Sequence, residues 1–190
     1  LNKWIDSLAA DGRVSDAARV SLEARLSAVA YWLPLAARQI DEDIEKVHQL
    51  RVSTRRAIPA LRLYDDWLPP GPTKWLARRL KRIRRAAGDA RDLDVLLEWL
   101  REPLLGDGAN HLHAQVAEKR AAAQPAIVAI ADKCDAENRL RRKIYRLLAG
   151  VRPRGGKAKK QDVSFYNWAE MRLEKAVDEF FSAMPNQSTD

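Results

Sequence analysis

Four basic side chains, spaced like one face of a helix, are the residues of this sequence best suited to binding chemistry. They are His48, Arg51, Arg55 and Arg62. At about 100° per residue, these positions fall within an arc of roughly 60° on an α-helix. Guanidinium groups donate paired N–H bonds to phosphate oxygens, and an imidazole adds a further donor. The pattern therefore predicts a row of hydrogen-bond donors suited to a polyanion.

The residues that follow extend this basic character. Positions 48–94 hold twelve Lys and Arg but only five Asp, and so carry nearly all of the chain's net charge of +8. A shared face is formed by Lys74, Arg78, Lys81 and Arg85, with Arg84 and Arg91 beside it. No Asp or Glu stands between positions 74 and 87 to neutralise this face at i,i+4 spacing, so the repulsion favours an external anion. Arg79 and Arg82 point elsewhere, and we expect them to be ordinary surface charges.

Helical periodicity dominates the chain, and no alternating run of β-branched residues interrupts it. The sequence therefore predicts an all-α fold of long, antiparallel helices. The first should run over 15–39, capped by Ser15 and bent or ended early by Pro34. The second should run over 43–67 with a kink at Pro59.

A third helix should begin near Pro72 or Thr73 and continue to residue 104, with Gly88 as a kink or a close-packing point. A loop at 106–108 precedes a helical stretch over 110–148 that is interrupted near Pro125. The last helix should cover 165–184. These elements suggest an N-terminal extension (1–14), a helical bundle (15–150), a basic Gly/Pro linker (151–162) and a final helix with its tail (163–190).

Other chemistries find little support in the sequence. His111 and His113 have no Cys or carboxylate at metal-ligand spacing, so we expect no metal site. Asp92 and Asp94 have no nucleophile nearby, and we expect them to orient guanidinium groups of neighbouring helices without catalysing a reaction. Cys134 is the single cysteine, which fits a reducing, cytoplasmic setting. We expect no cofactor and no membrane span.

Two motifs make the chain resemble the CHAD domain, the conserved histidine α-helical domain. They are HQLRVSTRR at positions 48–56 and LKRIRRAAGDARDLDV at positions 80–95. The resemblance implies two helical bundles related by a pseudo-twofold axis, with basic residues lining a channel between them. It also implies non-enzymatic binding of inorganic polyphosphate. The ligand-facing residues would be His48, Arg51, Arg55, Arg56, Lys81, Arg84 and Arg91, to which helical geometry adds Arg62 and Arg85. Ile58 departs from the family, which often has a basic residue there.

The chain lacks a second histidine-and-arginine helix, which family members usually carry in their second half. The sequence thus matches the first bundle and the start of the second. One interpretation is that the chain stops just before that helix, and the other is that two chains complete each other. We prefer the first, because residues 165–184 resemble the start of a second bundle.

We therefore expect a cytoplasmic polyphosphate-binding module, with association with polyphosphate granules as a further expectation. Sulfate or phosphate would replace the polymer in a crystal. The alternative is a helical nucleic-acid-binding domain in which GVRPRGGKAKK (150–160) acts as a basic arm. A third possibility, an enzyme acting on phosphate polymers, is disfavoured because the sequence has no acidic metal-binding cluster. The basic stretch over 139–160 ranks second as an anion-binding region, because its Gly and Pro content predicts mobility.

Overall fold

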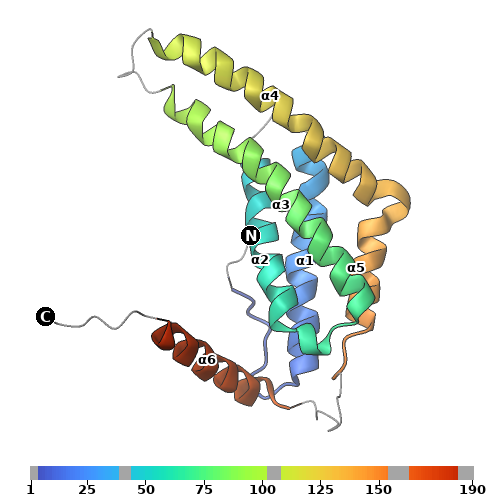
Figure 1. The fold of residues 1–190 in the computed structure, drawn as a ribbon. Helices are drawn as coiled ribbons and strands as arrows, with labels where there is room; N and C mark the ends of the chain where they lie inside the picture. Colours follow the sequence, from blue (N-terminus) through green and yellow to red (C-terminus); the bar gives the residue numbers. More distant parts are fainter. Residues whose placement is uncertain (1–3, 39–43, 102–107, 154–162, 184–190) are drawn as a thin grey trace, which may run out of the picture.

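The computed structural model describes residues 4–38, 44–101, 108–153 and 163–183. Within these ranges the regular structure is helical, apart from one isolated bridge between Arg13 and Ser164. The α-helices are α1 (Val14–Arg38), α2 (Glu45–Leu63), α3 (Pro70–Trp99), α4 (Gly108–Asp135), α5 (Arg139–Ala149) and α6 (Phe165–Ser182), as Figure 1 shows. The all-α fold predicted from the sequence is confirmed.

The core lies where α1, α2 and α3 pack together, with α5 against α1 and α3 and with α4 against α3 and α1. Each helix contributes an apolar stripe, whose burial drives the association. The largest fully buried side chains include Leu22, Leu26 and Leu33 of α1, Leu50 of α2, Leu76, Leu80 and Ile83 of α3, Ile127 of α4 and Leu147 of α5. Figure 1 shows that the C-terminal half of α3 and the N-terminal half of α4 project together past the ends of α1 and α2.

Prolines end fewer helices than the sequence predicted. Pro34 and Pro125 lie inside helices that continue beyond them, and Pro59 lies inside α2 as predicted. An internal proline removes one backbone hydrogen bond at a cost of about 3 kcal/mol, which the packing of a long apolar stripe offsets. A proline also begins one helix earlier than predicted: α3 starts at Pro70, before the predicted start at Pro72 or Thr73. Proline suits the first turn because the N–H it lacks would have no partner there.

Two further predictions about helix limits were wrong, and one of the two roles expected for Gly88 is excluded. The break between α4 and α5 lies at Glu137 and Asn138, both with φ of 54°, and not near Pro125. Ser15 does not precede the first helix, because α1 already begins at Val14. Gly88 is no close-packing point, since nothing lies within 4 Å of a Cβ built there. The predicted loop over 106–108 and the linker over 151–162 fall largely outside the described residues.

The last helix, α6, is attached mainly through its first turns. The Ser164 side chain caps it by accepting a bond from the Asn167 backbone N–H, and Trp168 is buried. The Trp168 ring stacks on that of Tyr64 with centroids 5.2 Å apart and meets the edge of Trp67 at 5.5 Å. Residues 10–14 hydrogen-bond to residues 163–166, so this part of the N-terminal segment also holds the start of α6. Beyond Ala169, every described residue of α6 is exposed.

Candidate functional site

Helix α2 separates its apolar and basic residues onto neighbouring flanks. Its buried residues are Val47, Leu50, Ser53, Thr54, Ala57, Ile58 and Leu61. On a helical projection the arc of His48, Arg51, Arg55 and Arg62 is centred about 120° away from that buried face. The helix can therefore pack into the core while the guanidinium groups stay at its edge.

One contact establishes which neighbour this basic flank faces. Arg51 of α2 places Nη2 3.8 Å from Oδ1 of Asp92 of α3. Asp92 lies within about 20° of Lys81 on the α3 projection, so the flank of α3 that carries Lys81 is the one beside α2. The two helices run antiparallel, because Arg51 lies early in α2 and Asp92 late in α3. The structure therefore places basic flanks of α2 and α3 next to each other.

We call the basic side chains on these adjoining flanks the α2–α3 surface: His48, Arg51, Arg55, Lys81 and Arg84. Arg55, Lys81 and Arg84 are exposed, and His48 and Arg51 are half-buried. Arg91 belongs to the same flank, but its side chain is only 16 % exposed and its Nη2 lies 4.0 Å from Glu98 Oε2. Most of the Arg91 side chain is thus covered by the protein.

Of the other predicted residues, Arg56 lies apart from this surface, whereas Arg62 and Arg85 lie at its margins. Arg56 is on the opposite flank of α2, beside Arg25 of α1; burial and the nearby Arg56 charge together lower the pKa of Arg25. Arg62 borders an apolar pocket that Ile5, Leu8, Tyr64 and other residues line between the N-terminal segment, α1 and α2. Arg85 is exposed and, like Lys81, lies about 20° from Asp92 on the α3 projection, but on the other side of Asp92.

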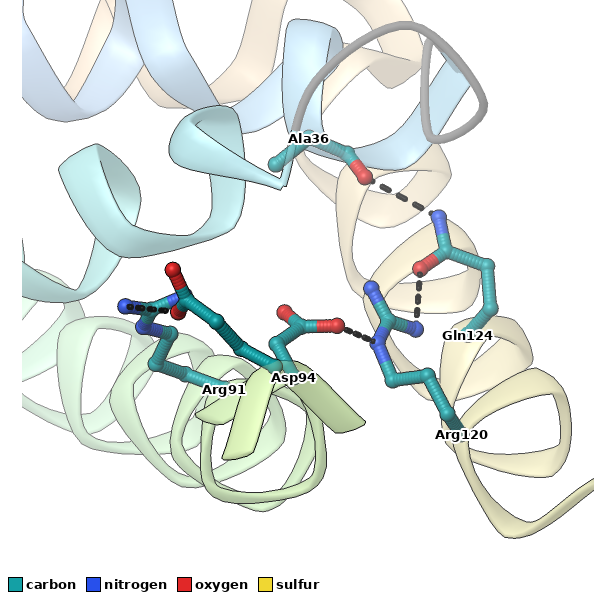
Figure 2. Close-up of polar contacts among 6 residues, drawn as sticks. Ala36, Arg91, Asp94, Arg120 and Gln124 are labelled. Carbon is teal, nitrogen blue, oxygen red and sulfur yellow. Dashed lines mark hydrogen bonds and ion pairs between the residues drawn. The ribbon is translucent and has the colours of Figure 1, made fainter. Parts of the chain in front are cut away.

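Asp94, two residues after Asp92, has a different environment. It is buried, and its Oδ1 accepts a bond of 2.5 Å from Nε of Arg120 on α4. Arg120 Nη1 in turn donates to Gln124 Oε1, and Gln124 Nε2 donates to the carbonyl oxygens of Ala36 and Ala37 at 2.9 and 3.0 Å. Figure 2 shows this chain of contacts from Asp94 to Ala36, which joins α3, α4 and the end of α1. Asp94 therefore holds the bundle together, away from the α2–α3 surface.

Arg120 was not among the residues predicted from the sequence, although a signal for it exists. Arg120 stands in the buried stripe of α4, whose other members are Val116, Ile127, Ala131 and Cys134. These positions recur at steps of three, four and seven, the spacing of one helix face. An arginine inside an apolar stripe predicts a buried partner of opposite charge, since an unpaired buried charge is very unfavourable.

The described part of the chain holds neither a metal-ligand group nor a membrane-spanning helix. Among the described residues, no group of three or more His, Cys, Asp and Glu side chains is arranged to hold a metal ion. None of the helices found there combines the length and the apolar character needed to cross a membrane.

Comparison with known proteins agrees with the resemblance seen in the motifs. A search of curated protein sequences returned no match. The structure is similar to the crystal structure of the CHAD domain from the plant Ricinus communis, with a TM-score of 0.62 and 26% sequence identity. That match covers 100% of this chain but 63% of the plant chain, so this chain spans less than two thirds of its relative's length. The CHAD domain family profile matches residues 20–190, and the chain therefore belongs to the CHAD domain family.

Proposed function

We propose that this chain binds inorganic polyphosphate on the α2–α3 surface, without catalysis and without a cofactor. The observation that carries the proposal is the juxtaposition of two basic flanks, which the Arg51–Asp92 contact establishes. Arg51, Arg55 and Arg84 would bind successive phosphates through paired N–H donors, and Lys81 would add a point charge. His48 can donate a hydrogen bond to a phosphate oxygen. A cytoplasmic location, expected from the single cysteine, is part of the same proposal.

The composition of the surface favours a simple phosphate polymer over a nucleic acid. Proteins that bind single strands without sequence preference usually provide aromatic side chains on which bases stack. No Trp, Tyr or Phe occurs between Arg51 and Arg62 or between Lys81 and Arg91. The surface thus offers donors for phosphates but no platform for bases. The CHAD resemblance likewise implies polyphosphate.

A double substitution, Arg51→Ala with Arg55→Ala, tests the proposal. Each phosphate that the protein neutralises releases counterions on binding, so the loss of two contacts reduces this release. With the single-strand value of about 0.7 per contact, the slope of log affinity against log salt should become shallower by about 1.4. Stability should change by less than about 1 kcal/mol, because both side chains lie at the surface. Affinity is measured across a salt series by titration calorimetry, and stability by urea unfolding.

Leu61→Ala is the matched control on the same helix. Leu61 is 2 % exposed, so its truncation should cost about 2 to 5 kcal/mol in stability while leaving the salt slope unchanged in the folded protein. If the double arginine variant keeps the wild-type slope, the ligand lies elsewhere. Competition between long-chain polyphosphate and single-stranded DNA of matched charge completes the test. Preference for DNA at every salt concentration would replace polyphosphate by nucleic acid as the ligand.

A further inference from the structure

The flank of α3 that faces away from α2 carries a second basic cluster. Helix α5 packs against α3 on this side, where α3 contributes Trp75 and three arginines. We call the cluster the α3–α5 cleft. It combines two pockets, one lined by Trp75, Arg78, Arg79 and Arg82 of α3 and the other by Arg139, Arg142, Lys143 and Arg146 of α5, which adjoin where Arg139 and Lys143 approach Trp75. Arg79 and Arg82 were expected to be ordinary surface charges. Residues 139–149 form a helix packed on the core, in line with the helical stretch predicted over 110–148, so the mobility expected from Gly and Pro does not apply to this part of the basic stretch over 139–160.

Trp75 is the point where the two rows of cations meet. The Arg79 guanidinium lies 5.2 Å from the centre of the Trp75 ring. From α5, the Arg139 guanidinium and the Lys143 ammonium both lie 5.9 Å from the same centre. The electron-rich face of an indole attracts cations at such distances. One half-buried aromatic ring therefore gathers cationic groups from two helices that would otherwise repel each other.

Few acids are placed to neutralise this cluster. Among the described residues that line the cleft, Glu137 is the one acid, and its Oε2 lies 2.8 Å from Arg142 Nη2. Asp132 and Asp135, at the end of α4, lie within 4.0 and 2.9 Å of Arg38, a residue of α1. The cationic groups also act on the core beneath them: burial raises the pKa of the Cys134 thiol, and Arg79 and Arg139 oppose this rise. The cleft is thus left with a surplus of positive charge.

We propose that the α3–α5 cleft is a second binding site for a phosphate-rich anion, namely a short stretch of inorganic polyphosphate. The inference rests on the proposed function for the nature of the ligand, but it uses none of the same residues. From Arg139 to Arg146 the cationic groups extend about 10 Å along α5, which is longer than one phosphate group. Helix α3 would then bind the polymer on both of its flanks, through the α2–α3 surface on one side and the cleft on the other.

The same geometry disfavours a nucleic acid in the cleft. Base stacking needs a free aromatic face, whereas three cationic groups lie within 6 Å of the Trp75 ring centre. Guanidinium groups held in this way present their remaining N–H donors to an oxyanion. A chain of phosphates satisfies such donors without needing any contact to an aromatic ring.

The test compares two charge-neutralising variants of the whole chain. Inorganic tripolyphosphate is the probe, because it is short enough to occupy each site separately. In titration calorimetry the wild-type chain should bind two equivalents, and the Arg79→Gln/Lys143→Gln variant should lose one of them. With long-chain polyphosphate, the same variant should show a salt slope shallower by about 1.4. The Lys119→Gln/Lys175→Gln variant, with exposed lysines on α4 and α6, loses the same charge and should keep both equivalents.

A local signal identifies the site that is occupied. The indole N–H resonance of Trp75, assigned with a Trp75→Phe variant, should shift when tripolyphosphate is added to the wild type and to the Arg51→Ala/Arg55→Ala variant. It should not shift in the Arg79→Gln/Lys143→Gln variant. If that variant unfolds, Arg82→Gln/Arg142→Gln replaces it, because both of these side chains are exposed.

The outcomes separate this inference from the proposed function. Loss of both equivalents in the Arg51→Ala/Arg55→Ala variant, with no shift of the Trp75 signal, would overturn the cleft and keep the α2–α3 surface. Loss of both equivalents in the Arg79→Gln/Lys143→Gln variant alone would keep the cleft and overturn the α2–α3 surface. Two equivalents in both variants would overturn both sites.

Discussion

Two aspartates that stand two residues apart on α3 form ion pairs in opposite environments. Asp92 lies 3.8 Å from Arg51, with side chains 72 % and 37 % exposed. Asp94 lies 2.5 Å from Arg120, with side chains 2 % and 7 % exposed. Positions two residues apart on an α-helix differ by about 200° in direction around the helix axis. One carboxylate therefore reaches solvent while the other enters the core. Similar residues in one short motif therefore have different effects on the protein.

The difference in burial determines what each pair contributes. An exposed ion pair is screened by water and contributes about 0 to 1 kcal/mol to stability. A buried pair has lost its hydration, so removal of one partner leaves an uncompensated charge in the core. Asp94 Oδ2 and Arg120 Nη2 have no further hydrogen-bond partner among the described residues, which makes the pair depend strongly on its one short contact. Asp94 and Arg120 thus depend on each other within the core, whereas Asp92 modulates the charge of the α2–α3 surface.

The largest effect is expected from Arg120→Ala. Removing the guanidinium leaves Asp94 buried and unpaired, which should lower the free energy of unfolding by about 3 to 5 kcal/mol. This is a large share of the total for a typical domain, about 5 to 15 kcal/mol. Urea unfolding followed by circular dichroism measures the change. A loss below about 1 kcal/mol would mean that the buried pair matters no more than the exposed one.

The double variant Asp94→Leu/Arg120→Met is the control for this prediction. It removes both charges and fills the space with apolar groups of similar length. Such replacements of buried pairs are often neutral or stabilising by about 1 to 4 kcal/mol. The double variant should therefore be clearly more stable than Arg120→Ala. If both variants are equally unstable, packing and not charge explains the loss.

A smaller effect, on binding and not on stability, is expected from Asp92→Asn. The substitution removes the carboxylate that competes with the ligand for Arg51, an interaction of about 1 kcal/mol at this distance in water. Polyphosphate affinity should therefore rise about fivefold. Asp89→Asn, also exposed on α3 but without this contact to Arg51, should raise the affinity less. Equal gains in the two variants would show that net charge, and not the Arg51–Asp92 contact, controls affinity.

The smallest effect, a loss of stability, is expected from Glu98→Gln. This substitution tests the Arg91–Glu98 ion pair, whose burial is intermediate. Arg91 is 16 % exposed and Glu98 is 66 % exposed, with 4.0 Å between Nη2 and Oε2. The long distance and the exposed carboxylate predict a loss of about 0.5 kcal/mol or less. Thermal unfolding of the variant beside the wild type measures it. A loss near that of Arg120→Ala would show that burial of the arginine alone sets the strength of a pair.

Much of the fold could be predicted from the sequence because helical periodicity is a local property. The buried stripe of α2 and its basic flank follow from residue spacing alone, as do the long helices and the all-α class. The CHAD motifs likewise predicted the family that the comparisons show. Helix limits at prolines were harder to predict, because packing with other helices decides whether a lost hydrogen bond ends a helix.

In the candidate site, too, residue spacing predicted some features and tertiary contacts decided others. Spacing placed His48, Arg51 and Arg55 on one arc, and the contact of Arg51 with Asp92 shows that this arc adjoins α3. Arg56 belongs to the same motif, yet α1 lies on its side of α2, where burial and the Arg56 charge lower the pKa of Arg25. No periodicity on one helix reveals which neighbour covers each of its flanks.

What the sequence by itself determined is therefore the set of helices, their apolar stripes and the surplus of positive charge on α2, α3 and α5. These depend on neighbours within a few residues, and the pattern of side chains records them directly. What only the tertiary structure decided is which charges meet. Arg120 finds Asp94 26 residues away, and Arg139 and Lys143 reach Trp75 from a helix more than 60 residues later. Such pairs form because packing of the apolar stripes brings distant helices together, and electrostatic contacts act only at the resulting short distances.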